Sequence, residues 1–136
     1  MRSTRQPSPS TVEHVVLLGD SIFANAAYVG SDPDVITHLR TMLPSGWKAT
    51  LCAVDGAATQ ALAAQVKQLP EDASRLFISI GGNDALGNID LLSMKVSSSS
   101  EMLAAFARRI AAFEKSYRHA IDAVIDRSLP TTVCTI

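Results

Sequence analysis

The strongest constraint on the fold is the order of four short apolar segments, which alternate with longer stretches of helical pattern. Each segment is rich in branched residues and is bounded by turn residues, which is typical of a buried strand. The four segments are Val15–Leu18, Lys48–Val54, Leu76–Ile80 and Thr131–Ile136. Strands separated by helices indicate a parallel sheet with helices on both faces. The sequence therefore predicts an α/β fold with three layers, α/β/α.

Three helices are predicted between these strands. The first has Asp32 as its cap and Pro33 at its first helical position. The second is an alanine-rich helix over Ala57–Leu69. The third begins at Ser98 and Glu101, which have capping-box spacing. Its apolar stripe, which predicts core packing, consists of Met102, Leu103, Phe106, Ile110, Phe113, Tyr117, Ile121, Val124 and Ile125.

Length and charge restrict the protein class. A chain of 136 residues forms one domain at most, and a net charge of −1 gives no support for a nucleic-acid partner. No apolar run approaches the ~20 residues that span a bilayer. Residues 1–13 are predicted to be a disordered tail without a secretory signal, which favours a cytoplasmic location. The domain is then expected over residues 14–136. Its two cysteines, Cys52 and Cys134, are isolated in apolar runs, which favours reduced, buried thiols over a metal site.

Small and polar residues follow three of the predicted strands, at the edge of the sheet where ligands of open α/β folds bind. The sequences are GDS at 19–21, VDGAAT at 54–59 and GGND at 81–84. Ser21 offers a hydroxyl and a backbone N–H, Gly56 an unobstructed N–H, and Asn83 a side-chain amide. Acyl transfer needs a nucleophile and donors for the developing oxyanion. Each feature alone is also common in turns, so the prediction depends on their combination.

Together the three blocks resemble those of the SGNH (GDSL-type) hydrolases, which are esterases and lipases of flavodoxin-like fold. The resemblance rests on GDSI at 19–22, VDGAAT at 54–59 and SIGGNDALGN at 79–88. It implies that Ser21 is the nucleophile and that Ser21, Gly56 and Asn83 form the oxyanion hole. It also implies an acyl-enzyme mechanism on a small-molecule ester or acylated substrate, with no metal or organic cofactor.

The resemblance also implies a catalytic histidine, closely preceded by an aspartate, in a block that this sequence lacks. Its three histidines are poorly placed to serve Ser21. His14 is expected ~20 Å away, at the opposite end of the first strand. His38 and His119 are expected on helices, facing solvent.

Aspartates and the end of the chain complete the predicted site. Asp20, Asp55 and Asp84 are expected at the same edge, each fixing its turn through backbone N–H groups. The simplest interpretation is a C-terminally incomplete SGNH domain, with four of five strands in the order 2-1-3-4-5. Residues Thr131–Ile136 then form an exposed edge strand that favours self-association. In this order the two cysteines are ~14 Å apart, too far for a disulfide.

Two functions remain open. The first is a serine ester hydrolase, impaired because its histidine is missing; the alternative is a non-catalytic binding module or inactive fragment. Nucleotide binding is disfavoured because the first loop has a single glycine and no run of backbone donors. The family acts on lipids, acetylated sugars, thioesters and simple esters. The loops at 23–31 and 85–97 do not choose among them, although Phe23 and Tyr28 are candidates for an acyl pocket.

Overall fold

The computed structural model describes residues 12–135. The predicted disordered tail, residues 1–13, lies outside this range except at its last two positions, and so does Ile136. Glu13 belongs to the ordered domain, because its backbone carbonyl accepts a hydrogen bond of 3.0 Å from the N–H of Lys48. Glu13, which the sequence assigns to the tail, is therefore joined to the rest of the structure.

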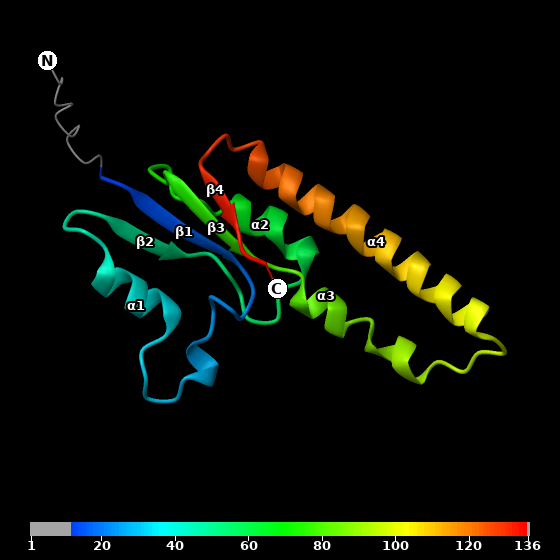
Figure 1. Ribbon diagram of the computed structural model, residues 1–136. Coiled ribbons are helices and arrows are strands. Elements are labelled where there is room, and N and C mark those ends of the chain that lie inside the picture. Colours follow the sequence, from blue (N-terminus) through cyan, green and yellow to red (C-terminus); the bar gives the residue numbers. More distant parts are fainter. Residues whose placement is uncertain (1–11, 136) are drawn as a thin grey trace, which may run out of the picture.

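A four-stranded parallel sheet forms the centre of the molecule, in the order β2-β1-β3-β4 (Figure 1). The strands are β1 (His14–Gly19), β2 (Lys48–Leu51), β3 (Arg75–Ser79) and β4 (Thr131–Val133). This order confirms the predicted one. β2 ends earlier than predicted because the N–H groups of Cys52 and Ala53 both bond to the carbonyl of Leu17, which ends the regular pairing.

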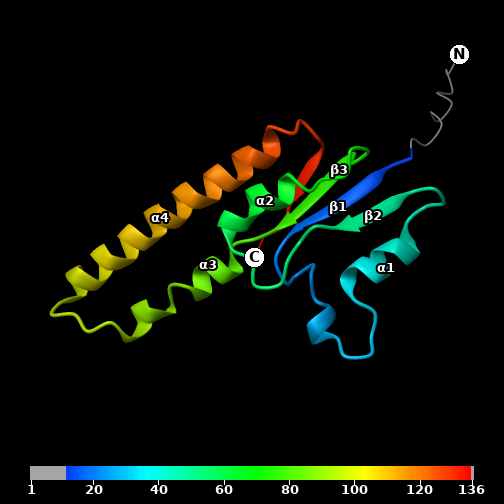
Figure 2. The ribbon, with the colours of Figure 1, turned by 180° about the vertical axis from the view of Figure 1, so that it is seen from behind.

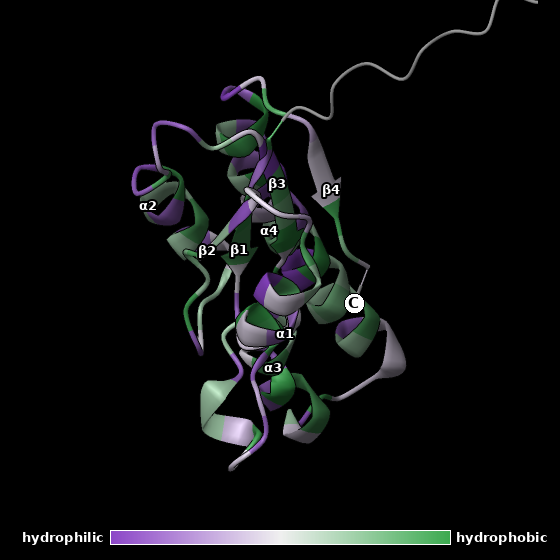
Figure 3. Ribbon diagram, turned by 90° about the vertical axis from the view of Figure 1, so that its left-hand side faces the viewer, coloured by the Kyte–Doolittle hydropathy of each residue, from purple (hydrophilic) through white to green (hydrophobic). Residues whose placement is uncertain are grey.

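Helices cover both faces of the sheet, as predicted (Figures 1 and 2). One face packs against α1 (Val35–Met42), and the other packs against α2 (Leu62–Val66) and α4 (Ser99–Ile125). The remaining helical segments are η1 (Ala26–Tyr28), η2 (Thr59–Ala61), α3 (Gly82–Leu86) and η3 (Ile89–Ser93). The helices carry both hydrophobic and hydrophilic residues (Figure 3), which fits elements with one face on the sheet and one in solvent.

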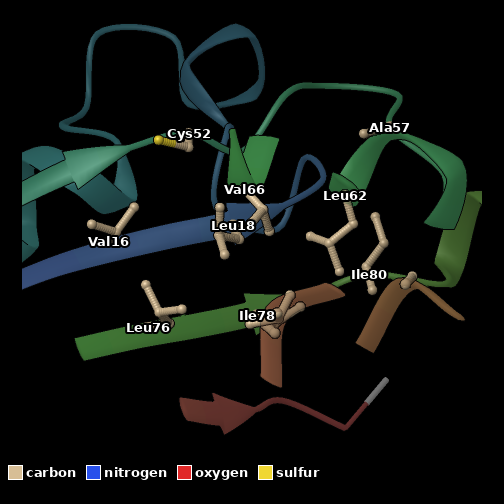
Figure 4. Packing of buried hydrophobic residues seen from close by; sticks show 11 residues of the cluster. Val16, Leu18, Cys52, Ala57, Leu62, Val66, Leu76, Ile78 and Ile80 are labelled. Carbon is tan, nitrogen blue, oxygen red and sulfur yellow. The ribbon is translucent and has the colours of Figure 1, made fainter. Parts of the chain in front are cut away.

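Alternate residues of the strands divide the core into two clusters. Val16 and Leu18 of β1 point toward α2, where they lie with Leu62 and Val66 (Figure 4). Val15 and Leu17 face α1 instead. Complete burial of a leucine or isoleucine contributes about 1.5–3 kcal/mol, so β1, buried along its whole length, anchors both layers.

Two predicted helices begin later than expected. The cap of α1 is Asp34, not Asp32, and its carboxylate accepts a hydrogen bond from the N–H of Thr37 at 3.1 Å. The carboxylate that reaches the unpaired N–H groups of the first turn is thus that of Asp34, two residues later than predicted. The predicted helix Ala57–Leu69 reduces to η2 and α2, because the N–H of Thr59 donates to Asp84 of another loop.

The helix α4 begins where the capping box predicts. The hydroxyl of Ser98 accepts a hydrogen bond from the N–H of Glu101, and the Glu101 carboxylate returns to the N–H of Ser97. The prediction that its apolar stripe packs into the core is wrong for Leu103, Ile110 and Ile125, whose exposed fractions are 69%, 61% and 59%. For Leu103 and Ile110 the reason is that the first half of α4 extends beyond the sheet (Figures 1 and 2), whereas Ile125 is the last residue of the helix.

Both cysteines are free thiols, but they differ in burial. Cys52 is buried, and desolvation raises the pKa of its thiol. Cys134 is partly exposed, so the prediction of two buried thiols is confirmed for Cys52 alone. Within residues 12–135, no helix combines the length and the apolar composition that a membrane crossing requires.

Candidate functional site

Ser21 lies in a tight turn directly after β1. Gly19 has a φ of +126°, and a Cβ atom there would lie 1.8 Å from the carbonyl oxygen of Ser79, so the position requires glycine. The N–H of Asp20 donates to the same carbonyl at 3.0 Å. The carboxylate of the buried Asp20 accepts from the N–H of Ile22 at 3.0 Å, which closes the turn around the half-buried Ser21.

A buried glutamine that the sequence did not single out holds the end of β1. The side chain of Gln65 accepts from the N–H of Gly19 at 2.7 Å and donates to its carbonyl at 2.8 Å. Gln65 is 3% exposed, so this pair satisfies polar groups that burial would otherwise penalise. A glutamine in an alanine-rich segment gives no sequence signal of this role, since most glutamines there face solvent.

Asn83 lies in the first turn of α3, after Gly81, which has a φ of +121°. Its side-chain N–H donates to the backbone carbonyl of Ala57 at 2.9 Å. This bond joins the loop after β3 to the loop after β2. An asparagine amide has a second N–H, which stays available to a ligand.

Gly56 lies in the same loop after β2, in a turn that the N–H of Ala57 closes on the carbonyl of Val54. It is exposed and has a φ of +78°. Unlike Ser21 and Asn83, it does not line the cleft described below. Within residues 12–135, the backbone N–H groups of Ser21 and Gly56 make no hydrogen bond. The role of Gly56 as an oxyanion donor stays a prediction.

The three aspartates expected at this edge all make hydrogen bonds, but only Asp20 fixes its own turn. Asp84 binds the N–H and the hydroxyl of Thr59, at 2.9 and 2.8 Å. Asp55 accepts from the hydroxyl of Tyr28 at 2.8 and 3.0 Å, and this bond raises the pKa of Tyr28. These aspartates thus join loops of different strands, which favours a structural role over that of a general base.

A cleft of about 800 Å³ lies between the strand-end loops, the segment of α3 and η3, and α4. Ser21 and Asn83 both line it, so the structure brings two of the three predicted site residues to one cavity. The aromatic candidates from the sequence, Phe23 and Tyr28, do not line it. Phe23 packs instead against the core cluster beside α1, and Tyr28 binds Asp55.

All three histidines are distant from Ser21 or turned toward solvent. His14 is the first residue of β1, ~20 Å from Ser21 along the strand. It is buried, and it binds Asp72 and Thr50 at 2.6 and 2.7 Å. His38 and His119 are exposed on α1 and α4, as predicted. None of the three lines the cleft.

Comparison with known proteins gives matches at the level of structure. No family model matches the sequence, and neither does any curated protein. AlinE4, an SGNH-hydrolase family esterase, superposes with a TM-score of 0.63 at 17% identity, over 93% of this chain and 60% of that one. An extracellular lipase from Streptomyces rimosus superposes with a TM-score of 0.57 at 24% identity, over 90% and 58%.

These similarities concern the fold, because both identities are below a quarter. The chain spans about three fifths of the length of each of these two neighbours. The neighbours agree with the family that the three strand-end blocks predicted. The protein therefore has the three-layer parallel α/β fold of the SGNH hydrolases.

Proposed function

We propose that this chain carries the nucleophile and the oxyanion site of an SGNH-type ester hydrolase. The observation that carries the proposal is that Ser21 and Asn83, from different strand ends, line one cleft. The N–H groups of Ser21 and Gly56 have no acceptor among residues 12–135, which supports the proposal further, since an oxyanion hole needs donors without another acceptor.

The proposed reaction is an acyl transfer in two steps. The Ser21 hydroxyl oxygen attacks the ester carbonyl carbon and passes its proton to a general base. The base returns the proton to the alcohol as the carbon–oxygen bond to the leaving group breaks, which leaves an acyl-enzyme. Water then attacks the acyl-enzyme by the same route and releases the acid. The N–H groups of Ser21 and Gly56 and the Asn83 amide stabilise the negative oxygen in both steps.

The general base is the part that residues 12–135 do not supply. The histidines are outside the cleft, and Asp20, Asp55 and Asp84 are committed to hydrogen bonds. Because serine and base act as a unit in such enzymes, we expect very low turnover from this chain alone.

The test is chemical rescue of that base. Hydrolysis of a p-nitrophenyl ester is measured with increasing imidazole for the wild type and Ser21→Ala. The variant reports the reaction of imidazole itself with the ester. We expect turnover by the wild type to rise above this background with imidazole. Equal rates for both proteins at every imidazole concentration would contradict the proposal. High wild-type turnover without imidazole would show that the chain already has a base.

A non-catalytic binding module is the second candidate, and the position of the histidines favours it. A fluorophosphonate probe separates the two candidates because it reacts with an activated serine. Labelling located at Ser21 by mass spectrometry, and increased by imidazole, supports the hydrolase. No labelling under either condition supports the binding module.

A further inference from the structure

We infer that the cleft beside Ser21 binds an alkyl chain, so that the substrates of this site are esters of aliphatic acyl groups. This inference rests on the proposed function and deepens it. The sequence left the substrate class open among lipids, simple esters, thioesters and acetylated sugars. The inference selects those substrates whose acyl group is an aliphatic chain.

The two long walls of the cleft are hydrophobic and come from different parts of the chain. The segment of α3 and η3 forms one wall, and the first half of α4 forms the other. Figures 1 and 2 show these two segments side by side. The residues that matter here are Leu86, Ile89 and Leu92 on the first wall and Phe106, Ile110 and Phe113 on the second. A chain lying between the walls contacts aliphatic carbon on the first side and both aliphatic and aromatic carbon on the second.

Large apolar side chains around this cleft are unusually accessible to solvent. The exposed fractions are 61% for Ile22, 78% for Leu92 and 61% for Ile110. Contiguous exposed apolar surface marks binding grooves more often than plain surface. Each Å² of apolar surface removed from water contributes about 25 cal/mol, so an alkyl ligand gains affinity here without polar contacts.

The polar groups of the cleft walls are already paired, which disfavours a carbohydrate ligand. Arg109 binds both carboxylate oxygens of Asp90, at 3.1 and 2.8 Å, and the side-chain oxygen of Asn88 at 2.7 Å. The amide of Asn88 donates in turn to the carbonyl of Asp84 at 2.8 Å. A sugar hydroxyl placed between the apolar walls would lose its hydrogen bonds to water without replacement, which is costly.

The hydrophobic walls are continuous with the nucleophile. Ile22 follows Ser21 directly and also lines the cleft, as does Asn83 of the proposed oxyanion site. An ester carbonyl bound at Ser21 therefore has its acyl chain next to the walls. The inference therefore concerns the acyl group of the substrate, and it makes no statement about the alcohol that leaves.

Binding is measured without catalysis, by the fluorescence of dansyl-labelled undecanoic acid titrated with protein. We expect saturable binding to the wild type and to Ser21→Ala, with displacement by decanoate. Ile110→Glu places a charge on the cleft wall, and we expect it to weaken binding by about tenfold or more. Leu103→Glu is the matched control, because Leu103 is exposed on the same helix and does not line the cleft.

Circular dichroism establishes that both variants fold. Absence of saturable binding to the wild type, or equal loss in both variants, would overturn the inference. Sedimentation velocity tests a second copy of the chain as the occupant. A dimer that Ile110→Glu dissociates, with fatty-acid binding unchanged, would also overturn it. Alkyl binding without fluorophosphonate labelling supports the cleft and rejects the hydrolase, whereas labelling without alkyl binding does the reverse.

Discussion

At the scale of single residues, the end of β1 depends on Gly19 more than on any polar group near it. Its backbone passes so close to β3 that no side chain fits, and this approach places the N–H of Asp20 on the carbonyl of Ser79. Gln65 satisfies both backbone groups of Gly19. The position of Ser21 is therefore fixed by neighbours that take no part in chemistry.

Replacing Gly19 by alanine tests this dependence. The new Cβ meets the Ser79 carbonyl at 1.8 Å and the backbone has a φ of +126°, so β1 and β3 must separate locally. We expect the free energy of unfolding, measured with urea, to fall by about 2–6 kcal/mol, because the strained backbone and the overpacked Cβ both contribute. The control is Gly30→Ala, at a φ of +61° with no atom near the new Cβ. It should cost about 1–2 kcal/mol, from the backbone alone. Equal losses for the two variants would show that contact with Ser79 is unimportant.

At the scale of secondary-structure elements, a buried polar contact joins three of them at the site. Thr59 of η2 is 1% exposed, and its hydroxyl donates to Asp84 of α3. Ser116 of α4 lies 2.8 Å from the same hydroxyl and acts as the donor, since the Thr59 proton points to Asp84. This contact orients α3, which carries Asn83, against α4, which carries one wall of the cleft.

Removing the Thr59 hydroxyl with nearly unchanged shape should loosen that contact. Thr59→Val leaves the carboxylate of Asp84 with one partner fewer in a partly buried place. We expect a loss of about 1–3 kcal/mol in the free energy of unfolding, together with weaker fluorophosphonate labelling of Ser21. The control is Thr132→Val on the exposed part of β4, which should change stability by less than about 0.5 kcal/mol. An unchanged stability of Thr59→Val would contradict this account.

At the scale of the whole molecule, the two ends of the sheet differ in the polar groups that they carry. The carboxyl end carries the candidate site, and the amino end carries an ionic cluster that connects β1, β2 and the loop before β3. There the carboxylate of Asp72 binds Nδ1 of His14 at 2.6 Å and the ammonium of Lys48 at 2.7 Å. These two bonds lower the pKa of Asp72 to about 2, and the bond from Lys48 has the larger effect.

This pKa predicts how acid affects stability. Because the folded pKa is below the usual 3.8, the contribution of Asp72 is fully present above that value and is lost as the pH falls toward 2. Asp34, Asp90 and Glu101 have lowered pKa values too and add to the acid sensitivity. Urea unfolding of the wild type and of Asp72→Asn at several pH values separates the contribution of the Asp72 carboxylate to the free energy of unfolding from that of the other acids. We expect the difference between the two proteins to shrink as the pH falls from 5 to 2. A constant difference would argue against an ionic contribution.

The edge strand also belongs to this scale. β4 is paired on one side with β3, and its residues Thr132 and Val133 are exposed. The self-association predicted from residues Thr131–Ile136 stays a prediction, and Ile136 lies outside the described residues. Sedimentation velocity, which also tests whether a second copy of the chain occupies the cleft, measures this self-association directly.

The sequence by itself determined the four strands, the three longer helical regions between them and their order along the chain. Local pattern is enough for this, because buried strands need branched apolar runs and a parallel sheet needs a connection between successive strands. The cap at Ser98 and the positions of Ser21 and Asn83 at strand ends follow from such patterns, whereas the strand order followed from the resemblance to the SGNH hydrolases. The error at Asp32 came from a local bond of Asp34, and the error at Ala57 came from the bond between Thr59 and the distant Asp84, neither of which propensity reveals.

Only the tertiary structure decided which side chains share a cavity and which are buried. The sequence predicted that Ile110 packs into the core. The first half of α4 extends beyond the sheet, however, so this residue lines a cleft instead. The buried roles of Gln65 and Thr59 depend on partners far away in the chain. Such contacts are set by how elements of fixed length meet in space, and a periodic pattern in one element carries no information about the length of its neighbour.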